Sequence, residues 1–98
     1  MPLREKKSKF VRMIAHQIEY VYKCGYEYTL PDCREKHMKN SLHHIGLAID
    51  MDLFKDGIYL DKTEDHLRFG LYWESLGGSW GGRFGDGRHY SLEHNGVK

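Results

Sequence analysis

Apolar residues at helical spacing mark the first part of the chain. They recur three to four positions apart, and this periodicity predicts a helix over residues 8–24. Ser8 stands where an N-cap is favoured, and Gly25 stands where a helix commonly ends. We expect His16, within this helix, to be a partly exposed surface residue. The apolar positions that define the stripe are Phe10, Ile14, Ile18, Val21 and Tyr22.

An alternating pattern follows and predicts short strands. Tyr26, Tyr28 and Leu30 alternate with polar residues, as expected for a half-buried strand over residues 25–30. This strand should end at Pro31, because proline lacks the N–H group that a sheet requires. The remaining segments are a polar loop or helical turn over 31–40, a second strand region over 45–54, a turn-rich excursion around Asp56–Gly57 and a last strand over 89–94.

The order of these elements favours an α+β fold. Residues 67–76 have the spacing of a second helix. The glycine-rich residues 77–88 must turn sharply or approach another group closely. The two helices and about three strands are segregated along the chain, which is typical of a small antiparallel sheet with flanking helices. A length of 98 residues fits a single domain over residues 1–98.

Composition and charge exclude several classes of binding partner and location. A net charge of +1 lacks the basic footprint of a nucleic-acid-binding protein. No apolar run approaches the roughly 20 residues that cross a bilayer, so we expect no membrane insertion. The charged N-terminus has no apolar signal segment behind it, which predicts synthesis in the cytoplasm without a signal peptide. Cys24 and Cys33 match no reactive or metal-binding motif, and we expect both to be packing residues.

His43 and Asp50 form the first candidate pair of metal ligands. They are seven residues apart in sequence, and neither a helix nor a straight strand brings both side chains to one zinc ion. A shared ion therefore requires a bend, which Gly46 would permit. Beyond the bend, alternation separates an apolar face from a small, acidic face that carries Asp50. An aspartate among apolar neighbours is costly to bury unless it is paired or binds a cation.

Asp86 and His89 supply the second half of a site. His89 can complete a His-Asp-His set with His43 and Asp50, and a catalytic zinc keeps three protein ligands and one open position for water. Asp86 would lie near that water without binding the metal. A carboxylate there can act as general base on the water and return the proton to the leaving amine.

The two segments resemble the motifs of one enzyme family. Residues 41–50 fit the pattern S-x-H-x-x-G-x-A-x-D, and residues 80–89 fit W-G-G followed by D-x-x-H. Together they resemble the zinc D-alanyl-D-alanine carboxypeptidase family, which includes VanY- and VanX-like enzymes. The resemblance is closest to the phage L-alanyl-D-glutamate endopeptidases, or endolysins, in residues 39–57, 72–77 and 80–94. It implies a Hedgehog/DD-peptidase-like fold, bound Zn²⁺ and hydrolysis of a peptide bond in the stem peptide of bacterial peptidoglycan.

The resemblance also implies a role for each matching residue. Asp86 matches the catalytic acid/base, and Ser41 opens the first motif as a contact to the substrate or to the site's hydrogen bonds. Arg34 is the nearest candidate for an upstream arginine whose guanidinium binds a substrate carboxylate. Trp80 is either a core aromatic residue or a wall of the substrate cleft. The zinc ligands of the family are matched by His43, Asp50 and His89.

The other histidines lack a motif. His44 adjoins His43, but adjacent side chains of a strand point in opposite directions, so we expect His44 to face away from the metal. We expect the remaining three to lie on the surface or around the site without binding metal. These are His37, His66 and His94.

The sequence leaves several functional alternatives. The leading interpretation is a zinc-dependent L-Ala-D-Glu endopeptidase of a phage lysis system, monomeric, made in the host cytoplasm and acting on the cell wall after release. A D-Ala-D-Ala carboxypeptidase is the alternative within the enzyme class. A non-catalytic zinc-containing cell-wall-binding module need not keep Asp86, and a structural phage component would need additional attachment sequence.

Overall fold

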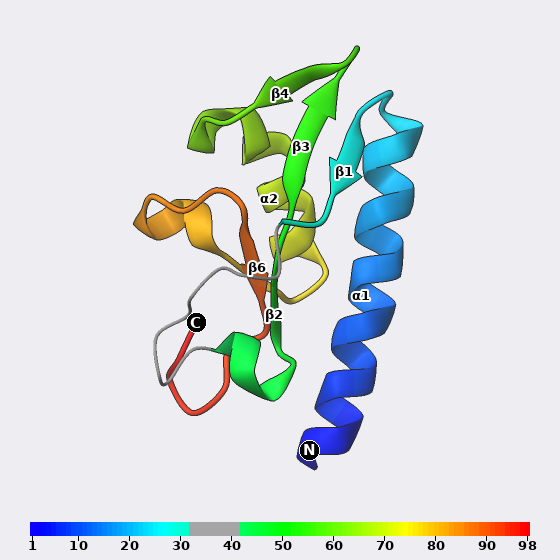
Figure 1. Ribbon diagram of the computed structural model, residues 1–98. Helices are drawn as coiled ribbons and strands as arrows, with labels where there is room; N and C mark the ends of the chain where they lie inside the picture. The colour runs from blue at the N-terminus through cyan, green and yellow to red at the C-terminus, as the bar shows by residue number, and fades with distance from the viewer. Residues whose placement is uncertain (32–41) are drawn as a thin grey trace.

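The architecture is taken from a computed structural model that describes residues 1–31 and 42–98. The described chain forms two α-helices, three 3-10 helices and six short strands (Figure 1). In order, the elements are α1 (Leu3–Lys23), β1 (Glu27–Thr29), the 3-10 helix η1 (Leu42–Ile45), β2 (Ala48–Asp50), β3 (Asp52–Lys55), β4 (Ile58–Leu60), the 3-10 helix η2 (Thr63–His66), α2 (Leu67–Ser75), β5 (Ser79–Trp80), the 3-10 helix η3 (Gly81–Phe84) and β6 (His89–Ser91).

The strands form two small antiparallel sheets. One has the order β1-β3-β4 and the other the order β2-β6-β5. The predicted α+β class with antiparallel sheets and flanking helices is confirmed, although the described residues contain six strands in two sheets rather than about three in one. The predicted strand over residues 45–54 is divided, because Met51 separates β2 from β3 and donates its N–H to the Arg88 carbonyl at 3.0 Å.

Helix α1 begins earlier than the apolar periodicity predicts. It starts at Leu3, so the prediction of Ser8 as N-cap is wrong and Ser8 lies inside the helix. Hydrophobic periodicity registers burial, and the first two turns of α1 are mostly exposed, so they carry no such signal. Gly25 has φ +85°, which confirms the predicted helix-ending glycine. The exposed position of His16 is confirmed as well.

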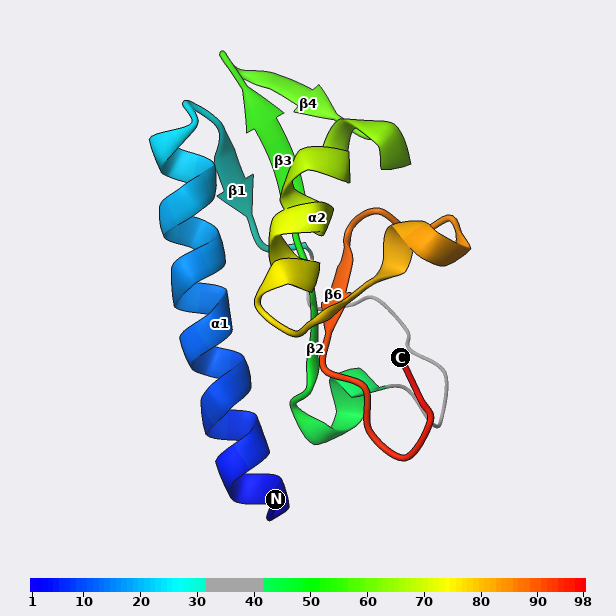
Figure 2. The same cartoon turned by 180° about the vertical axis from the view of Figure 1, so that it is seen from behind.

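One hydrophobic core joins the two helices to both sheets. In Figure 1, α1 runs along one flank of the molecule and α2 lies behind β3. Figure 2, which is seen from behind, shows α2 in front of β3. The rings of Phe10 on α1 and Trp73 on α2 meet edge to face with centroids 5.7 Å apart. The buried hydrophobic residues are Phe10, Met13, Val21, Tyr28, Leu42, Leu47, Met51, Leu53, Phe69, Trp73, Trp80, Tyr90 and Leu92.

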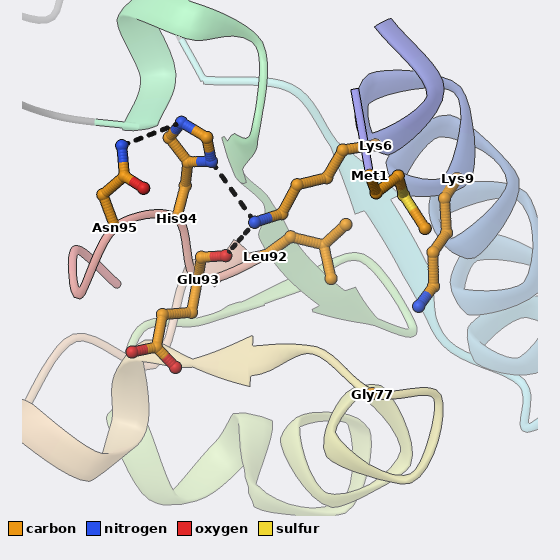
Figure 3. A pocket seen from close by; sticks show the side chains of 8 residues that line it. All are labelled: Met1, Lys6, Lys9, Gly77, Leu92, Glu93, His94 and Asn95. Carbon is orange, nitrogen blue, oxygen red and sulfur yellow. Dashed lines mark hydrogen bonds between the residues drawn. The ribbon is translucent and has the colours of Figure 1, made fainter. Parts of the chain in front are cut away.

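The start of α1 is tied to the end of the described chain (Figure 3). The ammonium group of Lys6 donates to the main-chain oxygen of Glu93 and lies 3.3 Å from Nδ1 of His94. A hollow of about 410 Å³ lies between these segments. Figure 3 shows Lys9, on α1, across this hollow from His94. The last residues are thereby held against the helix near the end of β6. Across residues 1–31 and 42–98, no helix is both long and apolar enough to cross a membrane.

Candidate metal centre

Three side chains from separate elements converge on one point. His43 comes from η1, Asp50 ends β2 and His89 begins β6. Nε2 of His43 lies 3.3 Å from Oδ1 of Asp50, and Nδ1 of His89 lies 3.5 Å from the same oxygen. Two ligand atoms bound tetrahedrally to one zinc ion, each at about 2.1 Å, lie roughly 3.4 Å apart. The spacing of the three donor atoms therefore fits a shared zinc ion, and the whole set lies within 4.8 Å.

The backbone explains how these residues meet. In the antiparallel pair β2–β6, Asp50 lies directly opposite His89. Gly46 has φ +74°, and its N–H bonds the His43 carbonyl at 3.3 Å, so the chain turns between η1 and β2 as the sequence predicts. The expectation of strand geometry at His43 and His44 is wrong, because both lie in a 3-10 helix. Successive side chains of a 3-10 helix point about 120° apart. His44 is exposed and lies outside the three-donor set, as expected.

The Asp50 carboxylate is the polar centre of the cluster. Its Oδ1 is buried and makes no hydrogen bond of normal geometry, although two imidazole nitrogens lie within 3.5 Å. Burial alone would raise the pKa of Asp50, but the close approach of the His89 ring and the charges of His89 and His43 outweigh burial and lower the pKa. An ionised oxygen between two nitrogens, without a well-directed donor, is what a cation bound by all three groups would satisfy. These residues therefore fit a zinc ion.

The outer nitrogen of His89 fixes the orientation of its ring. Nε2 of His89 lies 3.1 Å from the main-chain oxygen of Lys98, to which it can donate. Burial lowers the pKa of His89, but the Asp50 carboxylate and the Lys98 oxygen outweigh burial and raise it. In a neutral ring, a proton on Nε2 leaves the lone pair of Nδ1 directed at the metal position. A second hydrogen bond of this kind is usual for histidines that bind metal.

Asp86 lies beside the metal centre rather than in it. It precedes β6 on an exposed turn, where its N–H bonds the Gly81 carbonyl at 2.9 Å. Its own carbonyl accepts the N–H of His89 at 3.1 Å. The three-donor set does not include Asp86. This placement is compatible with an acid/base that acts near a ligand without binding the ion.

Gly81 leaves no room for a side chain beneath this turn, and Gly81→Ala should disturb both folding and zinc binding. A Cβ there would overlap the Asp86 carbonyl oxygen and lie 2.6 Å from Cβ of His89. We expect a loss of about 1–3 kcal/mol in the free energy of unfolding, as for other overpacked sites. Because the turn carries His89, zinc affinity should fall too. Thermal unfolding and a zinc titration measure the two effects.

Gly85→Ala is the matched control for this substitution. Gly85 has φ +84° but open space around it, so alanine adds backbone strain of about 1–2 kcal/mol and no collision. Zinc affinity should then stay at the wild-type value. Wild-type zinc affinity in Gly81→Ala would contradict the tight fit beneath the metal-ligand turn.

The predicted substrate-binding residues have different outcomes. Arg34 and Ser41 lie outside the described residues, so their roles remain predictions. Trp80 is 3% exposed, and its indole N–H donates to the Gly87 carbonyl at 2.9 Å. Of the two alternatives for Trp80, this burial favours a core aromatic residue over a wall of the substrate cleft. Cys24 is a half-buried free cysteine, whereas Cys33 lies outside the described residues.

Sequence reasoning left the place of one residue open and missed one contact. His66, expected on the surface or around the site, is 1% exposed, so it does not lie on the surface. Its spacing from Phe69 and Trp73, three and seven positions on, is the inward spacing of a helix and was the available signal. Arg88 forms an ion pair of 2.8 Å with Asp52, and nothing in the local sequence pattern indicates that contact.

The comparison with known families points the same way as the geometry. A family model described as D-alanyl-D-alanine carboxypeptidase matches residues 34–92, more than half of the chain. The matched region contains all three candidate ligands and the neighbouring aspartate. No curated protein matches this chain.

Proposed function

Because the chain belongs to the D-alanyl-D-alanine carboxypeptidase family of zinc peptidases, we propose that it hydrolyses the L-alanyl-D-glutamate bond of peptidoglycan stem peptides. The observation that carries this proposal is the convergence of three zinc-type ligands, with Asp86 three residues before one of them. The choice of an endopeptidase rests on the resemblance of residues 39–57, 72–77 and 80–94 to phage endolysins.

In the proposed reaction, the chain's own residues divide the work. His43, Asp50 and His89 would hold the ion, which would supply the Lewis-acid chemistry that polarises a carbonyl and lowers the pKa of water to about 7. Asp86 takes a proton from the attacking water as its oxygen bonds to the scissile carbonyl carbon. When the C–N bond breaks, Asp86 returns that proton to the leaving amine. Water is the only co-reactant, and the products are a carboxylate and an amine.

A D-alanyl-D-alanine carboxypeptidase is the second candidate, because the matching family carries that description. The same residues serve both reactions, and only the bond presented to them differs. Asp86 argues against a non-catalytic binding module, since a pure binder needs no acid/base beside the metal. We place the enzyme in phage or prophage lysis, as a monomer made in the host cytoplasm that reaches the wall after release.

Mass spectrometry of digested peptidoglycan tests the proposal. The zinc-loaded protein is incubated with peptidoglycan, and the new peptide termini are identified. We expect a new D-glutamate amine, whereas released D-alanine would support the carboxypeptidase. A chelated sample should be inactive and should recover when zinc is restored. If the zinc-loaded protein cleaves no bond, both candidate reactions are refuted.

A further inference from the structure

Residues 93–98 form a short hairpin directly after β6. The main-chain groups of His94 and Val97 exchange two hydrogen bonds of 2.9 Å each. Between them, Asn95 has φ +50° and Gly96 has φ +79°. Two positive φ values in the centre of a two-residue turn are typical of type I′, which an Asn-Gly pair favours. The chain therefore reverses sharply at this point.

The second arm of this hairpin supplies the acceptor that orients a metal ligand. The main-chain oxygen of Lys98 lies 3.1 Å from Nε2 of His89, while Nδ1 of the same ring lies 3.5 Å from the Asp50 oxygen. An acceptor at Nε2 keeps the ring proton there and fixes the plane of the ring, so Nδ1 stays available to the ion. Partners of this kind typically contribute about 10- to 100-fold to metal affinity. The position of one main-chain oxygen should therefore affect zinc binding.

Helix α1 holds the first arm of the hairpin at its base. The ammonium group of Lys6 donates to the main-chain oxygen of Glu93 and lies 3.3 Å from Nδ1 of His94 (Figure 3). Lys6 is half-buried, whereas residues 1–5 and 7–9 are exposed. Because Glu93 and His94 come directly before the turn, their position sets the direction in which the second arm returns.

Both ends of this connection lie outside the part of the chain that matches the zinc peptidase family. The family model covers residues 34–92, so Lys6 comes before the matched region and residues 93–98 come after it. The three candidate metal ligands lie inside that region. The link from α1 through the hairpin to a ligand is therefore additional to what the family match describes.

We propose that Lys6 is a positioning residue for the metal ligand His89. By holding the base of the hairpin, Lys6 keeps the Lys98 oxygen against Nε2 of His89 and thereby directs Nδ1 at the metal position. The inference rests on the metal centre and not on which peptide bond is cleaved. It gives α1 a part in zinc affinity in addition to its packing in the hydrophobic core.

Zinc affinity in variants of two lysines tests the role of Lys6. Lys6→Met keeps an unbranched side chain without the donor, so we expect a loss of about 3- to 10-fold, near the lower end of the range for orienting partners because Lys6 acts indirectly. Lys6→Arg can still donate to the Glu93 oxygen and should recover most of this loss. Lys9→Met removes the same charge across the hollow from His94 and should bind zinc as the wild type does. Competition with a chromophoric chelator measures each affinity.

Two glycines in similar turns separate the hairpin's effect from general stability. Gly96 follows Asn95, and Gly57, between β3 and β4, follows Asp56, which has φ +52°. Both glycines have φ +79°, and an added Cβ meets no atom within 4 Å at either position. Valine is strongly disfavoured at positive φ, so each Gly→Val substitution strains its own turn. Gly96→Val should lower zinc affinity by about 10-fold, whereas Gly57→Val should leave it unchanged.

NMR of the imidazole groups in the zinc-loaded protein provides a readout that a loss of global stability would not mimic. In the wild-type protein, the Nε2 proton of His89 should exchange slowly with water, because it is hydrogen-bonded to the Lys98 oxygen. This exchange should become faster in Lys6→Met and in Gly96→Val. It should stay at the wild-type rate in Lys9→Met and in Gly57→Val.

Several outcomes would overturn the proposal. Wild-type zinc affinity in Lys6→Met would do so, whatever the result for Gly96→Val. Equal losses in Lys6→Met and Lys9→Met would assign the effect to charge, and equal losses in the two glycine variants would assign it to stability. If Gly96→Val does not fold, Gly96→Ala replaces it, and the same criterion applies. A wild-type protein that binds no zinc refutes the positioning role together with the metal centre, whereas one that binds zinc but cleaves nothing refutes the proposed function alone.

Discussion

Replacing Asp86 with alanine should lower kcat by about 10²- to 10⁴-fold, the usual contribution of a positioned acid/base. The carboxylate is needed twice, first to accept a proton from water and then to deliver it to the leaving amine. Zinc should stay bound, because Asp86 is not one of the three converging donors. The turn should persist too, since Asp86 contributes to it through main-chain bonds to Gly81 and His89. Hydrolysis of a soluble stem peptide and the zinc content of the purified variant measure both expectations.

Asp61→Ala is the matched control for this experiment. Asp61 is an exposed carboxylate that lines one small pocket together with Asp86, so its removal changes the local charge by the same amount. We expect kcat to stay within about twofold of the wild-type value, as for surface substitutions in general. Full activity in Asp86→Ala would show that another group moves the proton. An equal loss in Asp61→Ala would show that local charge, not acid/base chemistry, is responsible.

The metal ligands illustrate how far the sequence alone can reach. The bend at Gly46 follows from the spacing of His43 and Asp50, and the φ of +74° agrees with it. The pairing of Asp50 with His89 across β2 and β6 is different, because strand register depends on contacts between distant segments. Only the order of the two motifs, as it occurs in a known family, linked the segments in advance.

Exposed edge strands limited the prediction of the fold. Strand β4 lies within the segment that the sequence predicted as a turn-rich excursion around Asp56–Gly57. Ile58 is 64% exposed and Tyr59 is 45% exposed, so the strand has no buried apolar face that an alternating sequence pattern would indicate. The alternation of residues 25–30 failed at Leu30, which is 68% exposed, although Tyr28 is buried as expected. Hydrophobic periodicity predicts the buried part of a helix or strand, and it gives no information about the exposed part.

The adjacent histidines His43 and His44 provide the sharpest test of the metal centre. His43→Ala removes a nitrogen that lies 3.3 Å from the Asp50 oxygen, and it leaves two protein ligands where a catalytic zinc requires three. We expect zinc affinity to fall by at least about 100-fold, more than the loss of a residue that only orients a ligand. Peptidase activity should fall with it at low zinc concentration. Competition with a chromophoric chelator measures the affinity.

His44→Ala changes the same residue type one position along the same 3-10 helix. Because His44 is exposed and its direction differs by about 120°, its removal should leave zinc affinity within about threefold of the wild-type value. The comparison controls for charge, side-chain volume and helix propensity, which the two substitutions alter alike. Equal losses in both variants would mean that η1, rather than one imidazole, supports the ion. Retention of wild-type affinity in His43→Ala would refute the three-ligand site, whatever the activity of the protein.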